Sequence, residues 1–282
     1  MVDGGDQVAR YYDANTPSFL RYGQGGGVGV IHRAVWGDGV RNRRDAFTFV
    51  HDLLARHLPT PTEGPATLLD LGCGVGATLL DLVKRTGARG VGITNSRVQL
   101  DLAADLARRA RLGDRVAFRL GDFSRLHLDA EVDLAYAVEA FVQGSDPDGF
   151  FATVAACTRP GGRLVICDDF LAEDTDPSAL APGDRRLLDE FRRGWRVASL
   201  MPPSAVDRLA AAAGFRLTTD LDLTERLELG RTRDKLIRVL VTAGRNLPCD
   251  HPRWLNLVGG NALQGCLRTR LVTYRFRVWD KA

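Results

Sequence analysis

The chain lacks any apolar run close to the roughly 18 residues that a membrane-spanning helix needs, so the sequence predicts no membrane span. Its net charge is only +3, from 38 basic and 35 acidic side chains, which does not indicate a nucleic-acid partner. It also lacks internal repeats and low-complexity tracts. What remains is a globular protein whose 282 residues, 45% of them apolar, are enough to bury a full core.

Cysteine is scarce as well. The five cysteines are an odd number, lie far apart and stand mostly inside apolar stretches. This pattern indicates reduced core residues and excludes a disulfide framework or a zinc site. Residues 1–7 are polar and lack the apolar segment of a signal peptide. We therefore expect a cytoplasmic protein.

The rest of the sequence is organised around one glycine-rich turn. Residues 67–78 have the pattern of a short apolar strand with Asp70 near its end, followed by Gly72, Gly74 and Gly76 and then a helix start. Glycines let the backbone bend sharply and let a ligand lie against it. A helix start offers unpaired N–H groups and a partial positive charge. In this order the three parts form the nucleotide-binding corner of an open α/β sheet.

The spacing of these glycines separates two kinds of nucleotide site. A dinucleotide-binding fold has G-x-G-x-x-G and an acidic residue about 20 positions later. This chain has G-x-G-x-G instead, and its second strand, residues 90–95, ends in neutral Thr94 and Asn95. An NADP-dependent reductase that uses Arg97 for a 2′-phosphate remains an alternative, but the spacing argues against it.

The third strand, residues 116–123, ends in Gly121, Asp122 and Phe123. A carboxylate can accept a hydrogen bond from the amino group of adenine while an aromatic ring covers a face of the base. Together, the three strand ends resemble those of class I methyltransferases, which use S-adenosylmethionine (SAM). The resemblance implies SAM as cofactor and an α/β fold, a Rossmann-like seven-stranded sheet with helices on both faces. In that fold the last strand is antiparallel and lies between strands five and six.

A second segment narrows the resemblance. Residues 92–99 are similar to a segment of the sterol, tocopherol, cyclopropane-fatty-acid and geranyl-diphosphate methyltransferases. In those families the residues at the places of Thr94 and Gln99 contact the cofactor ribose, whereas Asn95 replaces a common apolar residue. From position alone, a glutamine in the first turn of a helix is usually solvated, and it is the resemblance that favours cofactor contact for Gln99. The expected cofactor-binding residues are Asp70, Gly72, Gly74, Thr94, Asn95, Gln99, Asp122 and Phe123.

The fourth strand, residues 132–138, ends at Glu139. A carboxylate at the carboxyl end of a central strand faces the ligand crevice of such a sheet, although it can also be an exposed strand-end acid. The related families carry a Glu here in the active site. We therefore predict that Glu139 stabilises positive charge or accepts a proton. Several relatives have a nearby histidine, whereas this chain has Gln143.

The fifth strand, residues 163–167, follows a Pro-Gly-Gly turn that is again typical of class I methyltransferases. Asp168 and Asp169 stand at its end. A pair of carboxylates can hold Mg²⁺, but the sequence offers no third ligand. We therefore predict no metal site.

The sequence divides into four parts. Residues 1–62 are expected to form an N-terminal helical cap or lid, and residues 63–224 the SAM-binding core. Residues 225–268 are expected to be a helical insertion over the acceptor, and residues 269–282 the final strand. Five glycines within residues 23–29 fit either a flexible connector or a lid that approaches a ligand.

The aromatic residues of the expected cap point to an apolar acceptor, although they could also be plain core. We assign Tyr12 to a catalytic aromatic wall, and Tyr22, Trp36 and Trp254 to acceptor binding. Arg33, with other basic residues near the cap, could bind a diphosphate; ordinary solvated arginines are the competing interpretation. His32 is the candidate base for O- or N-methylation.

These residues favour one reaction over another. An oxygen nucleophile usually needs a base, whereas an alkene attacks the methyl group directly and leaves a carbocation that a carboxylate or aromatic face stabilises. We therefore predict SAM-dependent C-methylation of a small isoprenoid-like acceptor, with a prenyl diphosphate as one candidate. The alternative is O- or N-methylation of an apolar secondary metabolite. A SAM-binding protein without turnover and a homo-oligomeric state also stay open.

Overall fold

The computed structural model describes residues 8–16, 29–128, 131–176, 178–244 and 249–282. A single seven-stranded sheet has the order β3-β2-β1-β4-β5-β7-β6. Its strands are β1 (Thr67–Leu71), β2 (Arg89–Thr94), β3 (Val116–Leu120), β4 (Val132–Val138), β5 (Thr158–Leu171), β6 (Phe215–Asp222) and β7 (Val272–Lys281). β7 runs antiparallel to both β5 and β6. The predicted fold, including the place of the last strand, is confirmed.

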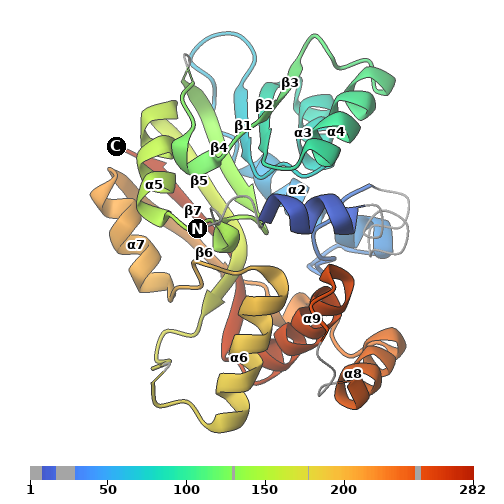
Figure 1. Cartoon of the computed structure of the whole chain (residues 1–282). Helices are drawn as coiled ribbons and strands as arrows, with labels where there is room; N and C mark the ends of the chain where they lie inside the picture. Colours follow the sequence, from blue (N-terminus) through green and yellow to red (C-terminus); the bar gives the residue numbers. More distant parts are fainter. Residues whose placement is uncertain (1–7, 17–28, 129–130, 177, 245–248) are drawn as a thin grey trace.

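Helices cover both faces of this sheet. They are α2 (Arg43–Arg56), α3 (Ala77–Thr86), α4 (Arg97–Arg109), α5 (Pro147–Cys157), α6 (Pro182–Trp195), α7 (Pro203–Ala212), α8 (Thr232–Gly244) and α9 (Pro252–Arg268), and residues 8–16 are also helical. α3 and α4 lie on one side of the sheet and α5 and α7 on the other, while α6, α8 and α9 gather at one end (Figure 1).

Local sequence explains where the helices that frame the site begin. Asn42 caps α2 by accepting a hydrogen bond from the amide of Asp45 at 3.0 Å. Ser96 caps α4 in the same way, through the amide of Gln99, as its position in the sequence predicts. The buried side of α2 carries Phe47, Val50 and Leu54, and it packs beside α3.

The bounds of β3 and β5 differ from the predicted ones in ways that affect the site. β3 ends at Leu120 because Asp122 turns back to accept a hydrogen bond from the amide of Ser124 at 2.8 Å, which starts a 3₁₀ turn. β5 continues to Leu171, because it pairs with β7 over its whole second half. The two aspartates predicted at the end of this strand, Asp168 and Asp169, therefore lie inside it and are buried.

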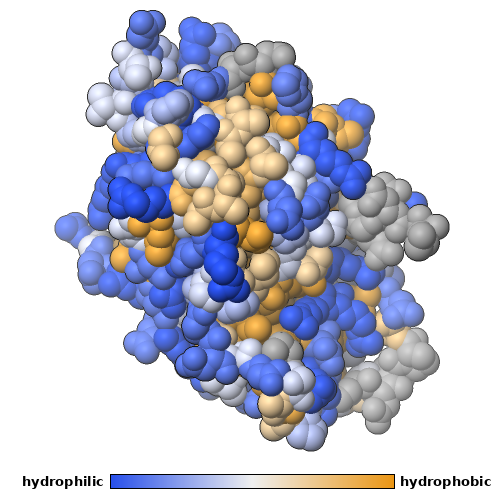
Figure 2. Space-filling view, turned by 90° about the vertical axis from the view of Figure 1, so that its left-hand side faces the viewer, coloured by the Kyte–Doolittle hydropathy of each residue, from blue (hydrophilic) through white to orange (hydrophobic). Residues whose placement is uncertain are grey.

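The core lies between the sheet and its helices, and its largest fully buried side chains include Tyr136, Tyr274 and Trp279. On the side of α5 and α7, Figure 2 shows hydrophobic residues gathered in a central band between hydrophilic ones. Among the described residues, no helix combines the length and the apolar character needed to cross a bilayer.

Candidate active site

A cavity of about 450 Å³ opens where the parallel strands end, under the group formed by α8, α9 and the N-terminal segment. This volume falls within the range of roughly 300–1,000 Å³ of small-molecule sites. Most of the residues predicted from the sequence line this one cavity. They are Tyr12, His32, Arg33, Asp70, Gly72, Gly74, Thr94, Asn95, Gln99, Asp122, Phe123 and Glu139.

The glycine turn forms the floor of the cavity. Gly72 has φ of +92°, and a Cβ there would lie 2.4 Å from the Cβ of Ala140, so no larger residue fits. Gly76, with φ of +78°, begins α3 without a side-chain cap. The first amides of α3 therefore remain available to a ligand.

Asp70 lies beside this turn and is buried. Its Oδ2 accepts a hydrogen bond from the hydroxyl of Tyr136 at 3.0 Å. Burial raises the pKa of Asp70 to about 7, against the lowering effect of this hydrogen bond. The carboxylate is therefore poised to ionise when a cationic group binds next to it.

The three residues predicted at the end of β2, Thr94, Asn95 and Gln99, all line the cavity. Gln99 lines the cavity, but its Oε1 accepts a hydrogen bond from Thr94 at 2.8 Å and its Nε2 donates to Thr16 at 3.2 Å. The side chains of Thr94 and Gln99 thus bind each other, because they face across the first turn of α4. Asn95 lines the cavity beside this pair.

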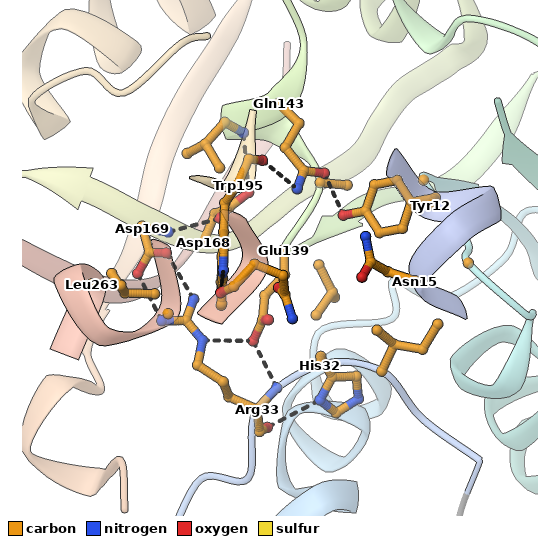
Figure 3. Close-up of a pocket in the computed structure, with 18 of the residues that line it drawn as sticks. Tyr12, Asn15, His32, Arg33, Glu139, Gln143, Asp168, Asp169, Trp195 and Leu263 are labelled. Carbon is orange, nitrogen blue, oxygen red and sulfur yellow. Dashed lines mark hydrogen bonds and ion pairs between the residues drawn. The ribbon is translucent and has the colours of Figure 1, made fainter. Parts of the chain in front are cut away.

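Arg33 joins two carboxylates at the centre of the cavity (Figure 3). Its guanidinium donates to both oxygens of Asp169, at 2.9 and 3.0 Å, and its Nε donates to Oε1 of Glu139 at 3.0 Å. The backbone amide of Arg33 donates to the same Oε1 at 2.8 Å, as does the hydroxyl of Tyr274 at 3.0 Å. Every donor to Glu139 from the described residues thus reaches Oε1, so Oε2 is left to the cavity.

The ion pairs of Arg33 influence the protonation of the carboxyl groups around it. Burial would raise the pKa of Glu139, but Arg33, followed by His32, outweighs it and lowers the pKa, so Glu139 is ionised. Burial, followed by the neighbouring Asp169, raises the pKa of Asp168 to about 8. Burial raises the pKa of Asp169 as well, against the lowering effect of Arg33, which holds its carboxylate in a bidentate pair. With both Glu139 and Asp169 ionised, two carboxylates against one guanidinium leave one excess negative charge, which suits a cationic ligand.

Glu139 also carries backbone strain. Its φ is +51°, a region that costs a residue with a Cβ of the order of 1–2 kcal/mol. The surrounding structure holds this conformation, since the amide of Glu139 donates to the carbonyl of Cys167 at 2.9 Å. Strain of this kind gathers at functional sites, where the fold enforces a side-chain direction. Here it turns the carboxylate from the end of β4 into the cavity.

Tyr12 approaches from the opposite wall. Its hydroxyl donates to Oε1 of Gln143 at 2.6 Å, and Nε2 of Gln143 donates to the carbonyl of Trp195 at 3.3 Å. Figure 3 shows these side chains around the same space as Glu139. Gln143 therefore acts as a polar bridge that positions an aromatic wall.

His32 lines the cavity below Glu139 (Figure 3). Its Nδ1 lies 3.1 Å from the carbonyl oxygen of Arg33, and its Nε2 lies 3.1 Å from Nε2 of His51. Burial, followed by His51, lowers the pKa of His32 to about 4. The ring is therefore neutral at pH 7, and both of its nitrogens lie within hydrogen-bond distance of protein groups.

Three of the predicted acceptor-binding residues need correction. Trp36 and Trp254 do not line the cavity: Trp36 is 38% exposed and its amide donates to the carbonyl of Arg226 in the turn after β6, and Trp254 packs against Gly244 of α8. Arg33 lines the cavity, but three of the five N–H groups of its guanidinium are engaged by Glu139 and Asp169, which argues against the predicted diphosphate contact. Tyr22 lies outside the described residues.

Tyr274 and Asp169 also belong to this site, in roles that their positions in the sequence do not predict. Asp169 was considered only as a metal ligand, yet it holds Arg33; among the described residues no cluster fits a metal ion. Two adjacent aspartates at an apolar strand are a signal for a buried cation partner, since unpaired buried carboxylates are costly. Tyr274 stands on β7 and gives no comparable signal.

Comparisons with known proteins agree with this geometry. A family model described as "Methyltransferase domain" matches residues 68–162. The 27-O-demethylrifamycin SV methyltransferase of Amycolatopsis mediterranei is 31% identical over 63% of this chain and 68% of its own. The sterol 24-C-methyltransferase of Eremothecium gossypii is 28% identical over 61% of this chain, which spans about half (46%) of that relative. The solved cyclopropane synthase MmaA2 from Mycobacterium tuberculosis has a TM-score of 0.78 at 18% identity, with 98% of each chain covered.

A Rossmann-like sheet with a nucleotide corner and an anionic cavity defines a class I methyltransferase fold and site. The chain belongs to the SAM-dependent methyltransferases, a family of enzymes that use SAM as cofactor. The residues present fit this cofactor, because the glycine turn lines the cavity without side chains at Gly72 and Gly74, and the buried carboxyl of Asp70 beside it can pair with the cationic amino group. Asp122 and Phe123, which line the cavity next to the turn, would hold the adenine.

Proposed function

We propose that this chain transfers the methyl group of SAM to a carbon of an apolar, isoprenoid-like acceptor. The observation that carries the proposal is the ionised carboxylate of Glu139, whose Oε2 points into a cavity walled by Tyr12 and Trp195. A negative charge and aromatic faces are what a developing carbocation needs. They are of less use to an oxygen nucleophile, which must first lose a proton.

The reaction makes a limited demand on the protein. SAM, when bound, supplies a methyl group on a positively charged sulfur. The chain must hold the acceptor carbon about 3–3.5 Å from that methyl and exclude water. Glu139 stabilises the positive charge that arises on the acceptor, and Arg33 keeps Glu139 ionised. Tyr12, fixed by Gln143, covers the cation from another side.

The far part of the cavity supports an apolar acceptor. It is lined by Ile237 of α8 and by Leu257, Leu263 and Leu267 of α9. We therefore propose that residues 1–62 and 225–268 form a cap over the SAM-binding core. The core consists of residues 63–224, and residues 269–282 complete its sheet. Because Arg33 is occupied, we favour an uncharged acceptor over a prenyl diphosphate, whose head would have to rely on cavity-lining arginines of α8 and α9.

A second candidate is O-methylation of an apolar secondary metabolite, with His32 as the base. Two observations favour it. The relative from Amycolatopsis mediterranei is named for a 27-O-demethylrifamycin substrate, and His32 is neutral at the cavity wall. This reaction would depend on His32 and tolerate the loss of the Glu139 charge.

The two candidates are separated by a panel of acceptors and one pair of variants. The full chain is incubated with SAM and geranyl diphosphate, farnesol, lanosterol or the phenol alizarin, and the products are resolved by mass spectrometry and NMR. The proposed function predicts a new C–CH₃ group on farnesol or lanosterol. Glu139→Gln should slow it at least tenfold while calorimetry shows SAM binding within about threefold of wild type. An O-methyl product, or full activity of Glu139→Gln, would contradict C-methylation.

The cellular compartment belongs to the same proposal. All five cysteines are free, and four of them are buried. Free thiols of this kind suit a reducing compartment, so we propose a cytoplasmic enzyme. Labelling of the thiols in intact cells would test it, since oxidised cysteines would contradict this location.

A further inference from the structure

The outer face of α8 carries an apolar stripe. Leu236, Val239 and Leu240 are 62, 65 and 59% exposed, the highest values for large hydrophobic side chains among the described residues. Their spacing of three and four residues places them side by side on one face of the helix. Single exposed apolar residues are common, whereas an adjoining group of them indicates an interaction surface. Figure 1 shows α8 at the outer edge of the group that it forms with α6 and α9.

The stripe is not what holds α8 in the fold. A different face of the helix carries Ile237, which lines the cavity, and Val241, which is buried. The helix packs beside α9. A helix at the surface of a globular protein needs one apolar face, which is turned to the core. α8 has a second one that is turned outwards, so the same helix borders the cavity on one side and solvent on the other.

The charged side chains next to the stripe are basic. Lys235 and Arg238 are exposed, and neither has an acidic partner among the described residues. The acidic residue of α8, Asp234, is buried and pairs with Arg231 at 3.0 Å. The outer face of the helix therefore keeps its positive charge.

Three kinds of partner come into question for such a stripe, and its residues favour one of them. A second copy of this chain would bring the same positive charge against it, which disfavours contact. An acidic protein would match the charge, but the hot spots of protein interfaces are enriched in Trp, Tyr and Arg, and Leu and Val are under-represented there. Anionic lipids offer both a negative surface and an apolar interior for aliphatic side chains.

We propose that α8 docks the protein on the surface of an anionic lipid bilayer. An amphipathic helix of this kind lies in the plane of the membrane, with its apolar side chains at the boundary between headgroups and acyl chains. Leu236, Val239 and Leu240 enter this boundary, while Lys235 and Arg238 contact the anionic headgroups. The contact is peripheral, since no helix among the described residues has the length and apolar character of a span.

Docking goes beyond the proposed methyl transfer, because it needs neither SAM nor an acceptor. What docking does for the enzyme rests on the proposed function. An apolar, isoprenoid-like acceptor dissolves in a bilayer, and Ile237 places the docked helix at the wall of the cavity. The acceptor then leaves the membrane next to the cavity and does not have to cross water.

The apolar part of the surface is tested by the double variant Leu236→Gln with Leu240→Gln. Glutamine is nearly as good a helix former as leucine, so α8 should keep its structure. The control is Leu120→Gln with Leu221→Gln, two leucines of β3 and β6 that are 43 and 37% exposed. None of these four side chains lines the cavity.

The charged part is tested by Lys235→Gln with Arg238→Gln. The control is Lys84→Gln with Arg109→Gln, an exposed lysine and an exposed arginine on α3 and α4. Both double variants remove two positive charges, and none of the four side chains lines the cavity. α3 and α4 lie far from α8 (Figure 1), so only the first variant changes the proposed surface.

The first experiment measures sedimentation of the full chain, without cofactor, with lipid vesicles. The vesicles consist of phosphatidylcholine alone or with about 30% phosphatidylglycerol, which makes their surface negative. The wild type should bind the anionic vesicles at least about tenfold more tightly than the neutral ones. Each α8 double variant should bind the anionic vesicles at least about tenfold more weakly than the wild type, because one Lys or Arg near such a surface contributes about fivefold and buried leucines contribute more. Each control should stay within about twofold.

Three results of this experiment would overturn the proposal. They are no binding of the wild type to the anionic vesicles, equal binding to both kinds of vesicle, and equal binding by an α8 variant and its control. Analytical ultracentrifugation tests the second copy as the partner. A wild-type dimer that dissociates in Leu236→Gln with Leu240→Gln, and not in its control, would place another chain on the stripe and overturn docking on lipid.

The second experiment measures turnover with lanosterol embedded in the anionic vesicles and with farnesol in solution. Leu236→Gln with Leu240→Gln should raise KM for lanosterol at least about fivefold with kcat within about twofold, and should leave both constants for farnesol within about twofold. An unchanged KM for lanosterol would overturn the supply of the acceptor through the bilayer. If the wild type methylates neither acceptor, the proposed function fails, whereas the vesicle experiment still decides on docking.

Discussion

Replacing Arg33 by methionine should destabilise the protein more than the loss of an ordinary arginine. The side chains of Arg33, Glu139 and Asp169 are 11, 16 and 2% exposed, so the ion pairs are buried. Removing one partner of a buried pair costs about 3–5 kcal/mol, because the other charge stays buried without compensation. An unfolding entropy of about 2.1 cal/mol/K per residue gives roughly 0.6 kcal/mol/K for this chain, hence a fall in Tm of about 5–8 °C.

The control is Arg43→Met. Arg43 lies 2.8 Å from Glu228, but their side chains are 42 and 35% exposed. An exposed pair contributes at most about 1 kcal/mol, so Tm should fall by less than about 2 °C. Scanning calorimetry of both variants and the wild type, without cofactor, makes the comparison.

The cost of Arg33→Met should also depend on pH. Without the guanidinium, burial raises the folded-state pKa values of Glu139 and Asp169 above their unfolded values. A group with a raised pKa stabilises the fold at low pH, and this contribution is lost as the pH rises through the folded pKa. The gap in Tm between Arg33→Met and wild type should therefore widen from pH 5 to pH 8. A gap that is constant with pH, or no larger than that of Arg43→Met, would refute the reasoning.

Two further predictions concern the cofactor corner and the strained acid. The pKa of Asp70 is about 7, and cationic SAM favours the ionised carboxylate, so the Kd of SAM should fall about tenfold from pH 6 to pH 8. Calorimetry should show this pH dependence of Kd in the wild type and not in Asp70→Asn. An equal pH dependence in the two proteins would refute the prediction. Because φ of Glu139 is +51°, Glu139→Gly should be more stable than Glu139→Ala by about 1–2 kcal/mol in urea unfolding. The opposite order would show that the backbone there is not strained.

The sheet and the cofactor corner could be predicted because their signals are local. Residues 67–71 and 132–138 are nearly continuous apolar runs, as expected for parallel strands buried on both faces. The glycines after β1 stand next to the strand that they terminate. The antiparallel place of β7 came from the family resemblance, since nothing in its own residues fixes its neighbours.

The centre of the site could not be predicted because its partners are far apart in sequence. Arg33 binds Glu139 across 106 residues and Asp169 across 136. Arg33 was predicted to bind a diphosphate because its neighbours in the sequence are basic and aromatic. The two carboxylates that it binds come close to it only in the folded chain.

His51 is a case in which the sequence did hold a signal. It stands four residues after Phe47 and three before Leu54, on the apolar side of α2. Helical spacing therefore predicts that it is buried, and a buried imidazole needs polar partners. The identity of those partners, His32 and Asp81, again requires the fold.

The position of Tyr274 has a consequence for biosynthesis. This residue belongs to β7, yet it holds Glu139, and the strand fills the gap between β5 and β6. A nascent chain that has left the ribosome only as far as α9 would have an open sheet and an unsupported acid. The enzyme should thus gain its competent centre in one late step, once residues 272–281 emerge, and partly made copies should be unable to react with an acceptor.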